Sequence, residues 1–161
     1  MQDTTDEKQG RVFMTIHHIS KLLFLGLLVV AGACTPDLSD DQIPYLPFPD
    51  IVLNLNLPDN LALKSKGIAK EIDGGVRGII VYCVEPGVYR AYERNCSYHP
   101  NEACATVNID ASQLYMFDPC CGSSFDFSTG NPMGGIAWRP LIRYSASYDG
   151  VYLTITDQVL N

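Results

Sequence analysis

The pattern of apolar and polar residues predicts short strands from residue 51 onward. Ile51–Leu57 alternates apolar and polar side chains, which indicates a strand with one face in water, ended by Pro58-Asp59-Asn60. Gly78–Val84 is apolar throughout and predicts a central strand. Glu85-Pro86-Gly87 then turns the chain back into a partner strand at Val88–Tyr92.

The rest of this region continues as short strands separated by turns, while Leu61–Ile72 has no clear pattern. The further predicted strands are Thr106–Ile109, Leu114–Phe117, Phe125–Phe127, and a final hairpin of Ile142–Tyr148 and Val151–Thr156 around Asp149-Gly150. No long helical periodicity interrupts them. The pattern therefore predicts an all-β domain over residues 51–161.

The N-terminal region has the pattern of an export signal. Met1–Phe13 is polar, so Met14 is an alternative start. From there Lys21 supplies the positive charge, Leu22–Val30 is apolar, and the small residues Ala31-Gly32-Ala33 lead to Cys34. The apolar stretch is shorter than the ~20 residues of a typical transmembrane helix.

This ending resembles a bacterial lipobox, with Ala31 where leucine is usual. The resemblance implies a signal peptide over residues 1–34, cleaved before Cys34, which then carries lipid. The alternatives are an ordinary secretory signal or a membrane anchor, with Cys34 incidental. Residues 35–50 contain four prolines and four aspartates, which predicts an extended, solvated tether.

Charge and composition exclude several functions. The net charge of −7 argues against nucleic-acid binding, because no basic stripe is present to neutralise phosphates. After the signal region the only histidine is His99, and we find no Ser-His-Asp set, phosphate loop or paired carboxylates. The sequence therefore predicts a protein that is not an enzyme.

Motifs between residues 75 and 156 resemble the Rieske iron–sulfur domain. They are, in order, Cys96-Ser97-Tyr98, the run Asp118–Asp126 (DPCCGSSFD), Thr129-Gly130, Gly135-Ile136-Ala137, and Arg139-Pro140-Leu141 followed by Tyr144. The resemblance implies an antiparallel β sandwich or barrel with a small subdomain of two loops.

The cluster ligands depart from the Rieske pattern. Two cysteines and two histidines hold a Rieske [2Fe–2S] centre. The four corresponding positions hold Cys96, Tyr98, Asp118 and Cys121, and His99 lies one residue past the expected place. The resemblance therefore implies a clusterless relative with no cofactor. In it Tyr98 packs where a histidine would lie, and Asp118 accepts backbone N–H bonds.

The resemblance also implies how the cysteines pair. Some Rieske domains join their two loops by a disulfide, and Cys120 occupies the place of its second cysteine. Cys104 is the expected partner, and Cys96 with Cys121 would form a second bridge. Disulfides are the default in an oxidising compartment. Cys83 lies in the apolar strand and is expected to be a buried thiol.

Two alternatives remain open. One is a zinc site built from Cys96, Asp118, Cys121 and either His99 or Cys104, whose donor atoms suit zinc. The other is electron transfer by a [2Fe–2S] cluster ligated by Cys96, His99, Asp118 and Cys121.

The preferred hypothesis is a lipoprotein of the bacterial cell envelope, facing the periplasm or the surface. It would be held at the membrane by its N-terminal lipid. Its Rieske-like domain would be a binding or structural module for an unknown protein or small molecule.

Overall fold

The computed structural model describes residues 42–161. The predicted signal peptide, its lipidation site Cys34 and residues 35–41 of the tether lie outside the described residues. Within residues 42–161, no helix is long and apolar enough to cross a membrane.

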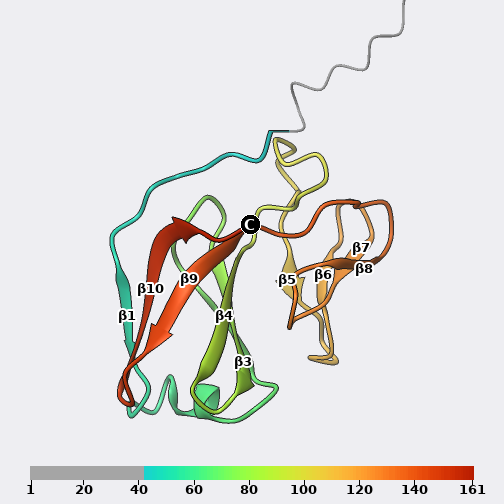
Figure 1. The fold of residues 1–161 in the computed structure, drawn as a ribbon. Helices are drawn as coiled ribbons and strands as arrows, with labels where there is room; N and C mark the ends of the chain where they lie inside the picture. The colour runs from blue at the N-terminus through green and yellow to red at the C-terminus, as the bar shows by residue number, and fades with distance from the viewer. Residues whose placement is uncertain (1–41) are drawn as a thin grey trace, which may run out of the picture. The chain divides into compact units, whose positions relative to one another are not determined.

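The larger sheet is antiparallel and has six strands (Figure 1). Their spatial order is β1 (Ile51–Asn54), β10 (Tyr152–Val159), β9 (Arg143–Tyr148), β4 (Val88–Glu93), β3 (Ile79–Glu85) and β2 (Ala69–Ile72). The predicted hairpins β3–β4 and β9–β10 are both present. A 3-10 helix, η2 (Leu61–Lys64), precedes β2.

A smaller antiparallel sheet is inserted between β4 and β9 in the chain (Figure 1). It consists of β5 (Asn108–Ile109), β6 (Met116–Asp118), β7 (Ser123–Phe125) and β8 (Pro132–Gly134). The prediction of an antiparallel all-β domain with a small subdomain of two loops is therefore confirmed.

Strand β3 carries no charged residue before Glu85, and its first three residues are fully buried, so both of its faces are covered there. Ile79 and Val81 lie in a first core, which is formed mainly by residues of the larger sheet. Ile80 points to the other side, where it packs with Met116 and Phe125 of the smaller sheet in a second core. Successive residues of a strand face opposite sides, so one strand connects both cores.

Several predicted strand boundaries were wrong, and local hydrogen bonds explain two of them. Strand β1 stops at Asn54, because the Asn54 side-chain oxygen accepts the Asn56 N–H at 2.9 Å and starts a turn. The predicted strand Phe125–Phe127 is instead β7, which begins and ends two residues earlier. Asp126 is excluded from it because its carboxylate accepts N–H bonds from Ser128 and Thr129 in an Asx-type turn.

Candidate functional site

Two loops and the end of β6, at Asp118, carry the residues at the predicted cluster-ligand positions. The first loop (residues 94–107) connects β4 to β5, and the second loop (residues 119–122) connects β6 to β7. A disulfide between Cys104 and Cys120 joins them, with an S–S distance of 1.99 Å and a Cα–Cα distance of 5.4 Å. This is the first of the two bridges that the sequence predicts.

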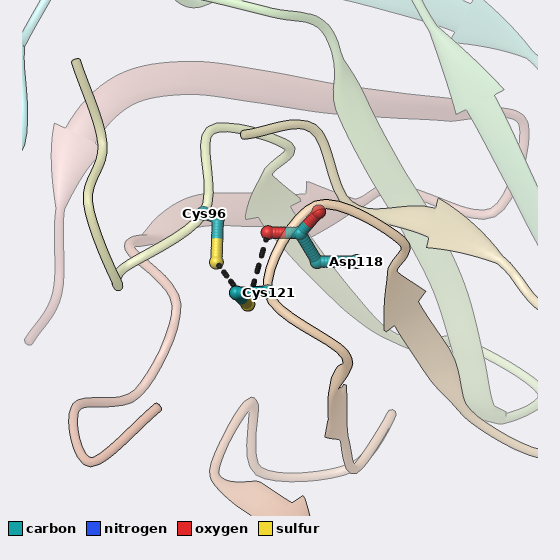
Figure 2. A group of neighbouring side chains, drawn as sticks. All are labelled: Cys96, Asp118 and Cys121. Atoms are coloured by element: carbon teal, nitrogen blue, oxygen red, sulfur yellow. Dashed lines mark hydrogen bonds between the residues drawn. The ribbon is translucent and has the colours of Figure 1, made fainter. Parts of the chain in front are cut away.

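Three further predicted residues meet beside this disulfide. Figure 2 shows the side chains of Cys96, Asp118 and Cys121 turned toward one another, with Cys96 on the first loop. The sulfur of Cys121 lies 3.7 Å from that of Cys96 and 3.2 Å from Oδ2 of Asp118. Cys96 and Asp118 are fully buried, while Cys121 is half-buried. We call these three side chains the loop triad.

The predicted second bridge, Cys96–Cys121, is not formed in this structure. A disulfide needs sulfurs about 2.05 Å apart, and these lie at 3.7 Å. Both cysteines are free thiols, and the Cys121 S–H donates to Asp118. The carboxylate thus offers the thiol a hydrogen bond in place of a bridge. Cys83 is also a free, buried thiol, as its position in β3 implies.

Backbone hydrogen bonds orient Asp118. Its Oδ1 accepts the Cys120 N–H at 2.8 Å, and its main-chain carbonyl accepts the Gly122 N–H at 2.9 Å. The other carboxylate oxygen, Oδ2, is left to face the sulfur of Cys121. Asp118 therefore closes the second loop as an Asx-type turn and presents one oxygen to the loop triad.

Tyr98 and His99 do not complete a ligand set. The Tyr98 N–H donates to the sulfur of Cys96 at 3.5 Å, and the side chain packs against the second core. The Tyr98 and His99 rings lie 4.3 Å apart, and Nδ1 of His99 is 3.3 Å from a carboxylate oxygen of Glu102. Among the described residues, no histidine nitrogen joins the donor atoms of the loop triad.

A standard Rieske [2Fe–2S] centre does not fit these residues. It requires two thiolates on one iron and two imidazoles on the other. The loop triad supplies two sulfurs and one carboxylate oxygen, all within 4.8 Å of one another. The proposed four-ligand set with His99, for either iron or zinc, is likewise not assembled here.

The second group of neighbouring donors is already used. Glu102, Cys104 and Cys120 also lie within 4.8 Å of one another. Because the two sulfurs are bonded to each other, they offer no thiolate to a metal. The alternative zinc ligand Cys104 is excluded for the same reason.

The protonation of Cys96 opposes a reactive-thiol role. Burial, followed by the hydrogen bond to Asp118, raises the pKa of the Cys96 thiol well above its ordinary value. Nucleophilic cysteines need the opposite shift, because the thiolate is the reactive form. Burial also raises the pKa of the Cys83 thiol.

A buried carboxylate that the sequence analysis missed anchors the first loop to the larger sheet. Glu93, at the end of β4, is fully buried and accepts four hydrogen bonds. The donors are the N–H groups of Val76 (2.8 Å), Arg77 (3.0 Å) and Asn95 (2.9 Å), and the hydroxyl of Tyr144 (2.8 Å). One of these donors directly precedes Cys96 in the chain.

Arg77 continues this anchoring. Its Nε donates to the Asn95 side chain at 2.6 Å, and its guanidinium donates to the carbonyls of Ala103 (2.7 Å) and Glu102 (2.5 Å). One arginine therefore ties the start of the first loop to the carbonyls of Glu102 and Ala103 later in the same loop. In the sequence, neither Arg77 nor Glu93 has a pattern that distinguishes it from an exposed charge.

The segment after β8 (residues 135–142) lies against both loops. The Ser123 hydroxyl, at the end of the second loop, accepts the N–H groups of Ile136 (3.1 Å) and Ala137 (2.9 Å). Ser97, on the first loop, exchanges two 2.7 Å hydrogen bonds with Arg139. Ile136 is 56% exposed and Trp138 is 67% exposed, so apolar side chains border the loops.

Comparison with known proteins assigns the chain to no family. No family model matches the chain, and no curated protein matches it. Among solved structures, it is similar to a chain from "Complex of reduced oxygenase and oxidized ferredoxin in carbazole 1,9a-dioxygenase" (16% identity, TM-score 0.48), covering 73% of this chain and 96% of that one. It is also similar to the ferredoxin of carbazole 1,9a-dioxygenase from Nocardioides aromaticivorans IC177 (18% identity, TM-score 0.44), covering 71% and 98%. These TM-scores are too low to support a conclusion on shared fold or function.

Proposed function

We propose that this chain is an envelope lipoprotein whose β domain is a binding module without an iron–sulfur centre. The composition of the loop triad carries the part of this proposal that concerns the missing cluster, and the lipobox-like ending at Cys34 supports the lipoprotein part. Two thiols and a carboxylate meet where a Rieske centre would need two thiolates and two imidazoles. The single described histidine lies beside Glu102 instead.

The surroundings of the loops support binding rather than catalysis. Cys96 is a buried thiol whose raised pKa suppresses the nucleophilic form. The exposed side chains of Ile136 and Trp138 border the two loops, and exposed apolar groups are common at interaction sites. The partner is a protein or small molecule that contacts this loop surface.

Spectroscopy with metal analysis tests the absence of a cluster. The full chain is purified anaerobically from iron-replete cells, and its visible spectrum, iron and acid-labile sulfide are measured. We expect a folded, colourless protein without iron or sulfide. Broad visible absorption with two iron and two sulfide per chain would refute the proposal and make the chain an electron carrier.

Membrane fractionation tests the tether separately. We expect the wild-type chain in the membrane fraction, labelled by a fatty-acid analogue, because several acyl chains on one residue give stable anchoring. Cys34→Ser should remove the label and release the chain, whereas Cys83→Ser, which changes a buried thiol of the domain, should not. An unlabelled wild-type chain, or a Cys34→Ser chain that keeps its label, would contradict the lipoprotein assignment.

A further inference from the structure

The spacing of the loop triad matches part of a tetrahedral metal site. Zinc binds thiolate sulfur at about 2.3 Å, so two sulfurs on one tetrahedral zinc lie about 3.8 Å apart. The Cys96 and Cys121 sulfurs lie 3.7 Å apart. A zinc-bound carboxylate oxygen at about 2.0 Å would lie about 3.5 Å from each sulfur. Oδ2 of Asp118 lies 3.2 Å from the Cys121 sulfur.

We propose that Cys96, Cys121 and Asp118 bind one borderline-soft divalent cation, with Zn²⁺ as the representative ion. This inference rests on the proposed function, because the three residues are free to bind a single metal ion only if they hold no iron–sulfur cluster. Two thiolates and one carboxylate are a donor set that suits zinc, whereas magnesium and calcium prefer oxygen ligands only.

The charge balance is compatible with the buried position. When the ion binds, the two S–H bonds break, two S–Zn bonds form, and two protons leave for solvent. Exchanging two protons for one dication leaves the net charge of the ion and its three ligands at −1, as in the metal-free triad with Asp118 as a carboxylate. No oxidant or reductant is needed. Within residues 42–161, neither of the two ion pairs found includes Asp118.

Groups around the triad hold two ligands in place. The Cys120 N–H fixes one oxygen of Asp118, and the Tyr98 N–H points to the sulfur of Cys96. Such outer hydrogen bonds orient ligands and tune a bound metal. Cys121 is half-buried while the other two ligands are fully buried, so the solvent-accessible approach to the site lies on the Cys121 side. A water molecule or a donor from a bound partner would complete the tetrahedron there.

Zinc titration of the full chain tests the proposal. The protein is purified anaerobically, its free thiols are counted, and Zn²⁺ is added in competition with a chromophoric chelator. We expect one Zn²⁺ per chain, and X-ray absorption at the zinc edge should show two sulfur neighbours together with lighter ones. That measurement needs no variant, so it remains decisive if a substitution prevents folding.

Matched variants locate the site. Cys121→Ser and Asp118→Asn should each weaken Zn²⁺ binding by at least about tenfold. Asp118→Asn keeps a side-chain oxygen that can accept the Cys120 N–H, so the turn is retained. Cys83→Ala, which removes a free thiol outside the triad, should bind as the wild type does. Zinc affinity that is unchanged in both triad variants would overturn the assignment.

The remaining outcomes separate this inference from the proposed function. Iron and sulfide in the purified protein would refute both. A colourless protein with three free thiols in the domain that does not take up Zn²⁺ would refute only the zinc site. A protein isolated with Cys96 and Cys121 bridged would also refute the zinc site, since its ligands would be consumed.

Discussion

Replacement of Glu93 by glutamine tests whether the buried carboxylate anchors the first loop. Each of its two oxygens accepts two hydrogen bonds: Oε1 from the N–H groups of Arg77 and Asn95, and Oε2 from the Val76 N–H and the Tyr144 hydroxyl. An amide supplies only one oxygen. Whichever way it is oriented, its NH₂ group faces at least one backbone N–H.

The least unfavourable orientation of the substituted glutamine places its NH₂ group where Oε2 was. The Tyr144 hydroxyl can rotate to accept from it, but the Val76 N–H then has no acceptor. Losing a hydrogen bond to a charged acceptor costs about 1.5–3 kcal/mol, and a fully buried unsatisfied donor costs about 1–3 kcal/mol, which is an upper bound for the half-buried Val76. These two costs overlap, so we expect Glu93→Gln to lower the free energy of unfolding by about 3 kcal/mol.

Tyr144→Phe is a milder variant that perturbs the same hydrogen-bond network. It removes one of the four donors and leaves the three backbone N–H groups on the carboxylate, so the expected loss is about 1–2 kcal/mol. Glu85→Gln, at the exposed end of the neighbouring strand β3, should change stability by no more than about 0.5 kcal/mol.

Urea unfolding of the three variants, followed by circular dichroism, gives these free energies from the transition midpoint and slope. The reasoning is refuted if Glu93→Gln unfolds at the same urea concentration as Glu85→Gln. It is also refuted if Tyr144→Phe costs more than Glu93→Gln, because the hydroxyl would then matter more than the charge that it binds.

Two further predictions concern the disulfide and the tyrosines. Replacing Cys104 and Cys120 together with alanine should lower the free energy of unfolding by about 3 kcal/mol, the loop-closure value for their separation of 16 residues, and a loss below about 1 kcal/mol in urea unfolding would contradict this. Burial raises the pKa of Tyr89 and of Tyr92 to about 12 each, above the ordinary value of about 10. The folded state therefore holds these protons more tightly than the unfolded chain, and stability should fall as the pH rises from about 10 toward 12. Tyrosinate absorbance should show a late-ionising group that includes Tyr89, Tyr92 and Tyr144, whose pKa burial also raises. A single transition near pH 10 in the folded protein would contradict this.

The hairpins could be predicted from sequence because their signals are local. The apolar run of β3 and the Asp149-Gly150 turn are each encoded by residues adjacent in the chain, and both lie where they were predicted. Strand β2 was missed because only Ile72 and Ala69 suggest it, and its pairing with β3 is what stabilises it. The short strands of the smaller sheet were found only approximately, since each is set by Asx turns and by contacts across the second core.

The sequence analysis named the residues of the candidate site, but it did not predict which of their atoms would bond to one another. The Rieske resemblance placed Cys96, Asp118 and Cys121 at neighbouring positions, and their donor atoms lie within 4.8 Å of one another. Whether two sulfurs approach to about 2 Å or stay at 3.7 Å depends on side-chain directions and on the competing bond to Asp118, which no spacing encodes. The roles of Glu93 and Arg77 also depend on contacts between distant segments.

Bonds other than those to a metal hold the two loops together. The Cys104–Cys120 disulfide joins them covalently, and the hydrogen bonds of Ser123 and Ser97 fasten each to the segment after β8. In a small zinc domain that unfolds without its ion, the binding energy is used for folding. Here the ligands are already within 4.8 Å of one another, so an ion can enter or leave without unfolding the domain. A site that is held in place by other bonds, and is accessible at Cys121, is better suited to exchanging a ligand with a partner than to holding the fold together.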